Sequence, residues 1–228
     1  MKIRLVMFDW DGTLIRSLEW KIRNGGLLFS DVFGVPAPDV ESAYRRHSGI
    51  PRRGLVAAIC QEMGLPALDE EQYAMMSARF SDMNRRILLD PSTTGLLPEE
   101  TPLALQALRE AGLVLYVSSS ADQQEIIDIA RSLGLYGYFT GTGGEILGSK
   151  PGFYKGRQHV AYVCRKQQVG LDEILFVGDE PTDIALGKEA GVQVAAIVGT
   201  YTAAQLAEAQ PDLIVANLTE LPVKLANR

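Results

Sequence analysis

Residues 3–14 read IRLVMFDWDGTL, a short apolar run that ends in Asp9, Asp11 and Gly12. The run has the length and composition of a buried strand, and the glycine marks its end. The two aspartates therefore leave the same strand, one residue apart. Because crowded carboxylates repel each other, such a pair is kept where a cation, a shared proton or the chemistry of a bound anion compensates.

The composition is that of a globular protein. The chain has 228 residues, of which 46% are hydrophobic and 22% charged, and its net charge is −6. The length suits one domain with an insertion. The acidic balance disfavours nucleic-acid binding, and neither a signal peptide nor an apolar segment long enough to span a bilayer is evident. We expect a cytoplasmic protein without nucleic-acid or membrane partners, in which Cys60 and Cys164 are buried thiols.

From about residue 112 onward, short apolar strands alternate with helices. A helix predicted at about 101–111 precedes this region. Strands are predicted at 113–117, 138–140, 174–177, 193–197 and 213–215, and helices at about 121–134, 155–168, 182–190 and 202–209. We expect Thr101 to cap the first of these helices and Ser120 to cap the second. The alternation predicts an α/β fold with a Rossmann-like, mostly parallel sheet covered by helices.

Residues 16–97 contain no convincing strand. Two stripes at helical spacing run through this segment: Leu55, Val56, Ile59, Cys60 and Met63, and then Tyr73, Met76, Phe80, Met83 and Ile87. Asp69 and Gln72 are placed as a capping box before the second stripe. The segment therefore predicts a small helical bundle inserted into a core made of residues 1–15 and 98–228, with both stripes in the core of the bundle.

Four polar features follow predicted strands or the loops beyond them. They are Asp9 with Asp11, Ser118, Lys150, and Asp179 with Asp183. Because ligands of open α/β sheets bind beyond the carboxyl ends of the strands, we expect these groups to share one site. Two glycine-rich stretches, 141–144 and 148–150, resemble nucleotide-binding loops but match neither of the established patterns. We interpret them as a flexible loop leading into Lys150.

These residue types suit the hydrolysis of a phosphate monoester. Asp9 and Asp179 are hard oxygen ligands for Mg²⁺, and the backbone carbonyl of Asp11 could complete the set. Asp9 can attack phosphorus, while Asp11 protonates the leaving alcohol and later deprotonates water. Lys150, the hydroxyl of Ser118 and the amides around Asp11 and Gly12 could contact the phosphoryl oxygens.

At these positions the chain resembles the haloacid dehalogenase superfamily of phosphohydrolases, and most closely its phosphoglycolate-phosphatase-like branch. Residues 9–14 match the first motif of that family, D-x-D-G-T-L, and residues 178–183, GDEPTD, match the fourth, G-D-x-x-x-D. Ser118 matches the second motif, and Lys150 with Pro151 matches the third. All four motifs occur in the family order.

The resemblance implies a fold, a cofactor and residue roles. It places a helical cap between the first and second motifs, which corresponds to residues 16–97. It implies Mg²⁺ bound at Asp9, Asp11, Asp179 and Asp183, with Asp9 as the nucleophile and Asp11 as the acid/base. It also implies that Gly12, Thr13, Ser118, Ser119 and Lys150 contact a small phosphorylated metabolite.

A basic segment lies within the predicted cap. Residues 45–53 read RRHSGIPRR, and charge runs of this kind usually form a solvated face. Arg52 or Arg53 could instead grip a carboxylate or a second phosphate of the substrate in a bidentate manner. Both interpretations stay open at this point.

Two alternatives to a phosphatase remain. One is a phosphomutase of the β-phosphoglucomutase type, which returns the phosphoryl group to its substrate. The other is a non-catalytic binding module on the same fold. A dehalogenase is disfavoured because a halide leaving group needs no proton from Asp11. A phosphonate hydrolase is disfavoured because that relative has alanine in place of Asp11 and uses a lysine of the cap, where this chain has Lys21 alone.

Overall fold

A parallel sheet forms the centre of the computed structural model, which describes residues 3–90, 92–150 and 152–226. Within these residues the strand order is β3-β2-β1-β4-β5-β6, and every neighbouring pair is parallel. The strands are β1 (Leu5–Phe8), β2 (Val114–Asp122), β3 (Ile146–Ser149), β4 (Ile174–Gly178), β5 (Gln193–Ile197) and β6 (Leu213–Val215). The predicted α/β fold with a Rossmann-like sheet is confirmed.

The strand β1 lies in the middle of the sheet because its residues are apolar on both faces. All four of its side chains are fully buried. Leu5 and Met7 pack in one cluster with Val160 and Val163 of the helix α8 (Arg157–Gln167). The run that opens the sequence therefore forms the centre of the core.

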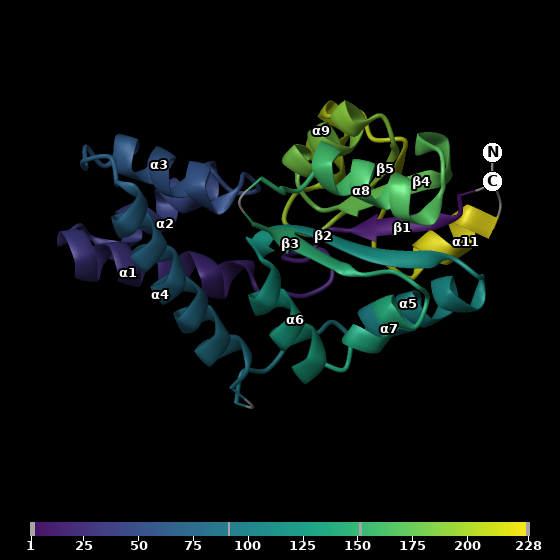
Figure 1. The fold of residues 1–228 in the computed structure, drawn as a ribbon, viewed down its shortest axis with the longest axis horizontal. Coiled ribbons are helices and arrows are strands. Elements are labelled where there is room, and N and C mark those ends of the chain that lie inside the picture. The colour runs from purple at the N-terminus through teal and green to yellow at the C-terminus, as the bar shows by residue number, and fades with distance from the viewer. Residues whose placement is uncertain (1–2, 91, 151, 227–228) are drawn as a thin grey trace. The chain divides into compact units, whose positions relative to one another are not determined.

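Helices cover both faces of the sheet (Figure 1). On one side lie α8 and α9 (Pro181–Ala190), and on the other lie α5 (Glu100–Glu110), α6 (Gln123–Ser132) and α7 (Tyr136–Thr140). The chain then adds α10 (Ala203–Glu208) and α11 (Glu220–Ala226). Because α6, α8, α9, α10 and α11 each follow a strand, the loops that begin these helices gather at the carboxyl edge of the sheet.

Two elements differ from the sequence prediction. The strand predicted at 138–140 is wrong: these residues belong to the single-turn helix α7, in which the Tyr138 amide donates to the Leu135 carbonyl at 3.0 Å. Aromatic residues favour strands, but here one helical turn buries Phe139. The edge strand β3 was instead predicted as loop, because Gly148 weakens its pattern. A Cβ at Gly148 would lie 2.4 Å from the Gln123 backbone, so the close approach requires glycine.

Both predicted caps in the core are also wrong. The hydroxyl of Thr101 donates to the carbonyl of Leu14 at 2.9 Å, and α5 begins after Glu99. The cap of α6 is Asp122, whose carboxylate accepts from the amides of Gln124 and Glu125 at 3.0 Å each. A carboxylate at this position satisfies two backbone donors at the start of the helix.

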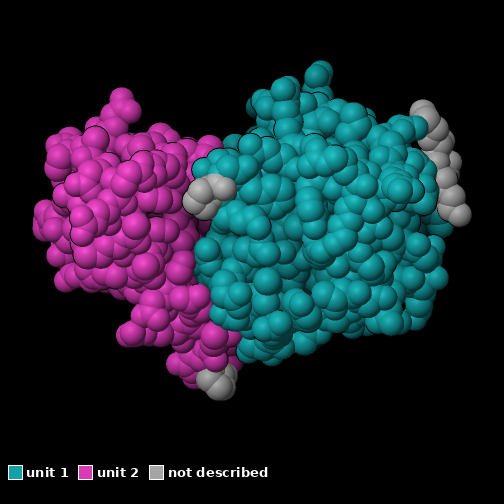
Figure 2. All heavy atoms as spheres, viewed as in Figure 1, with its two compact units in different colours: residues 1–16, 95–228 teal, residues 17–94 magenta. Residues whose placement is uncertain are grey.

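Residues 17–94 form a compact unit separate from residues 1–16 and 95–228 (Figure 2). In the part of this unit that the structure describes, the helices are α1 (Leu18–Phe33), α2 (Ala37–Arg46), α3 (Arg52–Glu62) and α4 (Glu70–Leu88). The predicted boundaries, 16 and 97, lie within three residues of these limits. We refer to this segment as the helical unit and to the rest as the core unit.

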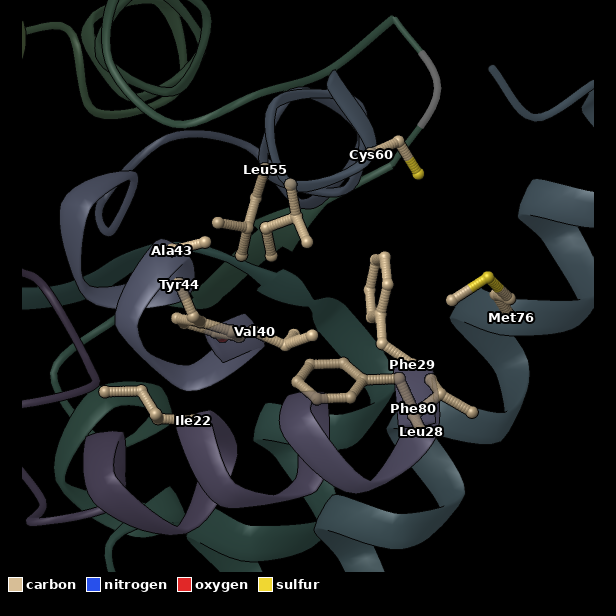
Figure 3. Packing of buried hydrophobic residues seen from close by; sticks show 11 residues of the cluster. Ile22, Leu28, Phe29, Val40, Ala43, Tyr44, Leu55, Cys60, Met76 and Phe80 are labelled. Carbon is tan, nitrogen blue, oxygen red and sulfur yellow. The ribbon is translucent and has the colours of Figure 1, made fainter. Parts of the chain in front are cut away.

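The helical unit has its own apolar core (Figure 3). Leu55, Ile59 and Cys60 of α3 are buried there together with Met76 and Phe80 of α4. Asp69 and Gln72 form the predicted capping box, with the Gln72 amide donating to Asp69 at 2.8 Å. The cap before α4 is therefore confirmed, and so is the core position of both stripes except at Tyr73 and Ile87, which are half-buried and lie outside this cluster.

Among the described residues, no helix combines the length and the apolar character needed to cross a membrane. Cys60 and Cys164 carry free thiols, of which Cys60 is buried and Cys164 partly buried. The cytoplasmic location stays a prediction.

Candidate active site

Asp9 directly follows β1 and extends its pairing with β4. Its amide donates to the carbonyl of Val177 at 2.8 Å, and its carboxylate is almost fully buried. The chain then turns sharply at Gly12, which has φ +90°. A Cβ at Gly12 would lie 2.3 Å from Oδ2 of Asp179, so glycine lets this turn approach the carboxylate closely.

Three buried carboxylates meet at this edge of the sheet. Asp9, Asp179 and Asp183 each offer an oxygen, and these oxygens lie within 4.8 Å of one another. Asp179 follows β4, and Asp183 lies in the first turn of α9. The second oxygen of Asp183 accepts from the amides of Asp179 and Glu180 at 3.2 Å each, which holds the turn together. Two segments that are about 170 residues apart in the sequence thus share one acidic cluster.

Lys155 is the cation of this cluster. Its Nζ lies 2.6 Å from Oδ1 of Asp9 and 2.5 Å from Oδ1 of Asp183, and its side chain is 3% exposed. Burial alone would lower the pKa of Lys155, but the carboxylates of Asp183 and Asp9 raise it above the ordinary value. The ammonium therefore stays charged. Gly156, with φ +94°, lets the chain turn from Lys155 directly into α8.

The sequence pattern predicts this lysine at position 150, and substrate contact by Lys150 stays a prediction. Lys150 is exposed, and its Nζ lies 5.2 Å from the ring centroid of Phe153. Both lysines belong to the connection between β3 and α8, which leaves the carboxyl edge of the sheet. The sequence indicated the connection, and a lysine at the start of the helix predicted at about 155–168 was a usable signal for Lys155. Which of the two side chains turns inward depends on packing against β1 and α9.

The acidic cluster carries more negative than positive charge. Burial raises the pKa of Asp9 well above its ordinary range; Lys155 opposes this shift, while Asp183, Asp179 and Asp11 reinforce it. Burial and then the charge of Asp183 raise the pKa of Asp179 to about 7. A further cation would relieve both effects. The three carboxylates are hard oxygen donors of the kind that Mg²⁺ prefers, so these residues fit the implied metal.

Two threonines hold the carboxylate of Asp179. The hydroxyl of Thr13 donates to Oδ1 at 2.8 Å, and the hydroxyl of Thr200 donates to Oδ2. Thr13 was predicted to contact substrate, but its hydroxyl is used on Asp179. Thr200 was missed; it follows β5, and its place after a strand at the same sheet edge was the available signal.

The serines that follow the apolar part of β2 are both buried. The Oγ of Ser118 lies 2.9 Å from Nδ1 of His159, a residue of α8 that the sequence did not single out. The Oγ of Ser119 accepts from the amide of Ala121 at 3.1 Å. Ser119 therefore supports the backbone at the end of β2, and its substrate contact stays a prediction.

Two predicted groups of the first motif have different surroundings. Asp11 is half-buried, and its charge contributes to the raised pKa of Asp9. The amide of Gly12 donates to the carbonyl of Ile15 at 2.8 Å. Substrate contact by this amide stays a prediction, while the close approach to Asp179 gives Gly12 a steric role.

The two arginines predicted to meet substrate are engaged within the helical unit. Arg52 donates to the hydroxyl of Ser81 at 2.6 Å and lies over the ring of Phe80. Arg53 pairs through both of its terminal nitrogens with Glu70 at 2.7 and 2.5 Å. Substrate contact by Arg52 or Arg53 stays a prediction.

Comparison with models of protein families identifies the family of this chain. The model of the haloacid dehalogenase-like hydrolases matches residues 3–191, and the chain therefore belongs to this family of hydrolases. The matched segment contains the acidic cluster, Lys155 and the whole helical unit.

Individual relatives are distant. A phosphoglycolate phosphatase of Mesorhizobium japonicum is 24% identical over 98% of this chain and 95% of its own length. Another, from Rhodospirillum rubrum, is 28% identical over 87% of this chain and 81% of its own. A crystal structure described as a "predicted phosphoglycolate phosphatase" from Haemophilus somnus superposes with a TM-score of 0.80 at 23% identity, covering 99% of both chains. A β-phosphoglucomutase of Clostridium difficile reaches 0.77 at 16% identity over 99% of this chain and 96% of its own. At these identities the superpositions show the fold alone.

Proposed function

We propose that this protein is a Mg²⁺-dependent phosphatase of a small phosphorylated metabolite, with 2-phosphoglycolate as the first candidate. The observation that carries the proposal is the buried cluster of Asp9, Lys155, Asp179 and Asp183 at the carboxyl edge of the sheet. The names of its relatives support the choice of substrate. In that role the helical unit is the cap that selects among leaving groups.

Asp9 is the nucleophile in this proposal. Its carboxylate attacks phosphorus and forms an aspartyl-phosphate, which water then hydrolyses. The reaction needs the anionic form of Asp9, which burial disfavours and the ammonium of Lys155 favours. Lys155 therefore keeps the nucleophile charged and also offsets the negative charge of the phosphoryl group.

Asp11 is the acid/base, and Ser118 donates a hydrogen bond to the phosphoryl group. Asp11 is less buried than Asp9, which suits a group that exchanges protons with the leaving alcohol and with water. Asp9, Asp179 and Asp183 would hold Mg²⁺, and the threonines on Asp179 orient one of these ligands. When bound, Mg²⁺ would supply positive charge beside the phosphoryl oxygens.

The test is phosphate release from 2-phosphoglycolate and from p-nitrophenyl phosphate, with and without Mg²⁺. We expect release that needs Mg²⁺, that Asp9→Asn reduces below detection and that Asp11→Asn lowers about 10²–10⁴-fold. Asp31→Asn, at an exposed aspartate of the helical unit, is the matched control. Binding of these esters without turnover would favour a non-catalytic module. Isomerisation of β-glucose 1-phosphate without phosphate release would favour the mutase.

A further inference from the structure

His159 is a buried titratable residue that the proposed chemistry does not use. It is fully buried, lies in the first turn of α8 and is four residues beyond Lys155. The ring of Phe153 packs against it at 4.5 Å between centroids. Its Nε2 has no hydrogen-bond partner within the described ranges. Its Nδ1 faces the hydroxyl of Ser118, and the imidazole also has a hydrogen bond with the backbone of Gly148.

The hydrogen bond between Ser118 and His159 can have either residue as its donor. A serine hydroxyl has one proton to donate, whereas it can accept two hydrogen bonds. If that proton points to Nδ1, the oxygen turns lone pairs toward a phosphoryl group. If instead Nδ1 carries the imidazole proton and donates it to Oγ, the serine proton is free for a phosphoryl oxygen. The state of the imidazole therefore decides whether Ser118 can act as a donor.

The surroundings keep the imidazole neutral. Burial and then the nearby charge of Lys155 lower the pKa of His159 to about 3, although the hydrogen bond with the backbone of Gly148 opposes this shift. A neutral ring carries one proton on one of its two nitrogens, so it can donate to Ser118 without adding a charge to the site. The packing of Phe153 against the ring restricts its rotation and keeps Nδ1 on the side of Ser118.

We propose that His159 is a positioning residue that donates from Nδ1 to Ser118 and so turns the serine proton toward the phosphoryl group. This inference rests on the proposed function, because it needs Ser118 to contact the substrate. It assigns a task to the first turn of α8, which begins two residues after Lys155. The segment that runs from Lys155 into α8 then provides the ammonium and orients the hydroxyl of Ser118.

A double-mutant cycle tests the coupling. His159→Leu keeps an apolar side chain but removes the donor, and we expect it to lower kcat roughly 3–10-fold, the effect of one hydrogen bond. Ser118→Ala should cost about 10²-fold. If His159 acts through Ser118, adding His159→Leu to Ser118→Ala costs less than about twofold more. Equal losses from His159→Leu in both backgrounds would overturn the proposal, as would no loss in the parent protein.

Two further variants separate positioning from folding. His159→Asn offers an amide N–H near the position of Nδ1, and we expect it to stay within about threefold of the parent kcat. Tyr162→Phe, the matched control, removes the hydrogen bond from the same helix to Glu145 and should leave kcat unchanged. If His159→Asn loses as much as His159→Leu, the donor role is wrong.

The tautomer can be observed directly, which also covers the case in which His159→Leu fails to fold. The chain has two histidines, so ¹H–¹⁵N correlation spectra of the imidazole rings are simple, and His159→Asn assigns the signals. With inorganic phosphate and Mg²⁺ bound, we expect the proton of His159 on Nδ1. A proton on Nε2 would overturn the proposal. Absence of phosphatase activity in the parent protein would instead mean that the proposed function has failed.

Discussion

The core unit and the helical unit use the same kind of ion pair in opposite settings. In the core unit, the ammonium of Lys155 bridges Asp9 and Asp183, with side-chain exposures of 3%, 8% and 1%. In the helical unit, Arg79 of α4 meets Asp31 of α1 at 2.6 Å, with exposures of 48% and 66%. The distances are alike, but the solvent around the charges is not.

The difference in burial distinguishes charged groups that suit chemistry from charged groups that suit a solvated surface. Burying an ion costs several kcal/mol, and a buried pair often stabilises a protein no better than apolar residues of the same volume. An exposed pair contributes about 0–1 kcal/mol. A buried cluster with excess negative charge therefore points to a ligand, whereas the exposed pairs of the helical unit need no function.

The two lysines of the β3–α8 connection give the largest expected effect. Lys155→Ala removes the ammonium beside Asp9, and we expect phosphate release to fall about 10²–10³-fold. Lys150→Ala changes an exposed lysine of the same loop and should stay within about twofold of the parent. Steady-state assays with p-nitrophenyl phosphate measure both. Equal losses in the two variants would contradict the distinction between buried and exposed charge.

Metal removal should destabilise the core unit. Mg²⁺ at 100 times its dissociation constant stabilises a folded protein by about 2.7 kcal/mol. We expect EDTA to lower Tm in the parent protein, while Asp179→Asn, which replaces one proposed ligand, no longer responds to Mg²⁺. Thermal unfolding with a Mg²⁺ titration checks this. An unchanged response in Asp179→Asn would remove Asp179 from the metal site, and Asp31→Asn serves as the exposed control.

Buried His159 should make stability depend on pH. The pKa of His159 is about 3 in the folded protein, which lies below the ordinary value of 6.5. Between pH 6.5 and pH 3, His159 is therefore protonated in the unfolded chain and neutral in the folded chain. This contribution to stability is complete above pH 6.5 and is lost as the pH falls toward 3. At pH 5 the loss is about 2 kcal/mol. Urea unfolding at pH 7 and pH 5 should show a smaller loss in His159→Asn than in the parent protein.

The smallest effect is expected at the exposed pair. Arg79→Ala breaks the contact with Asp31, and we expect the free energy of unfolding to change by about 0.5 kcal/mol or less. Activity should be unchanged. A loss of several kcal/mol in urea unfolding would show that exposure is a poor guide to the value of an ion pair in this protein.

The patterns that predicted the fold correctly are those with a strong local signal. The apolar run before Asp9 forms β1, and the capping box of Asp69 and Gln72 begins α4 as predicted. The failures lie in short segments. Residues 138–140 form a turn of helix instead of a strand. The strand β3 was not predicted because Gly148 weakens its apolar pattern, and glycine is needed there because the backbone of Gln123 lies so close. Contacts of that kind leave no periodic trace in the sequence.

The sequence by itself determined that Asp9, Asp179 and Asp183 would meet, because each follows or nearly follows a strand of a parallel sheet and such ends share one edge. Only the tertiary structure decided that Lys155 points inward while Lys150 is exposed, and that His159 faces Ser118. The position of a strand end depends on local pattern. The direction of a side chain in a loop or a first helical turn depends on packing against residues distant in the chain, and no local pattern records it.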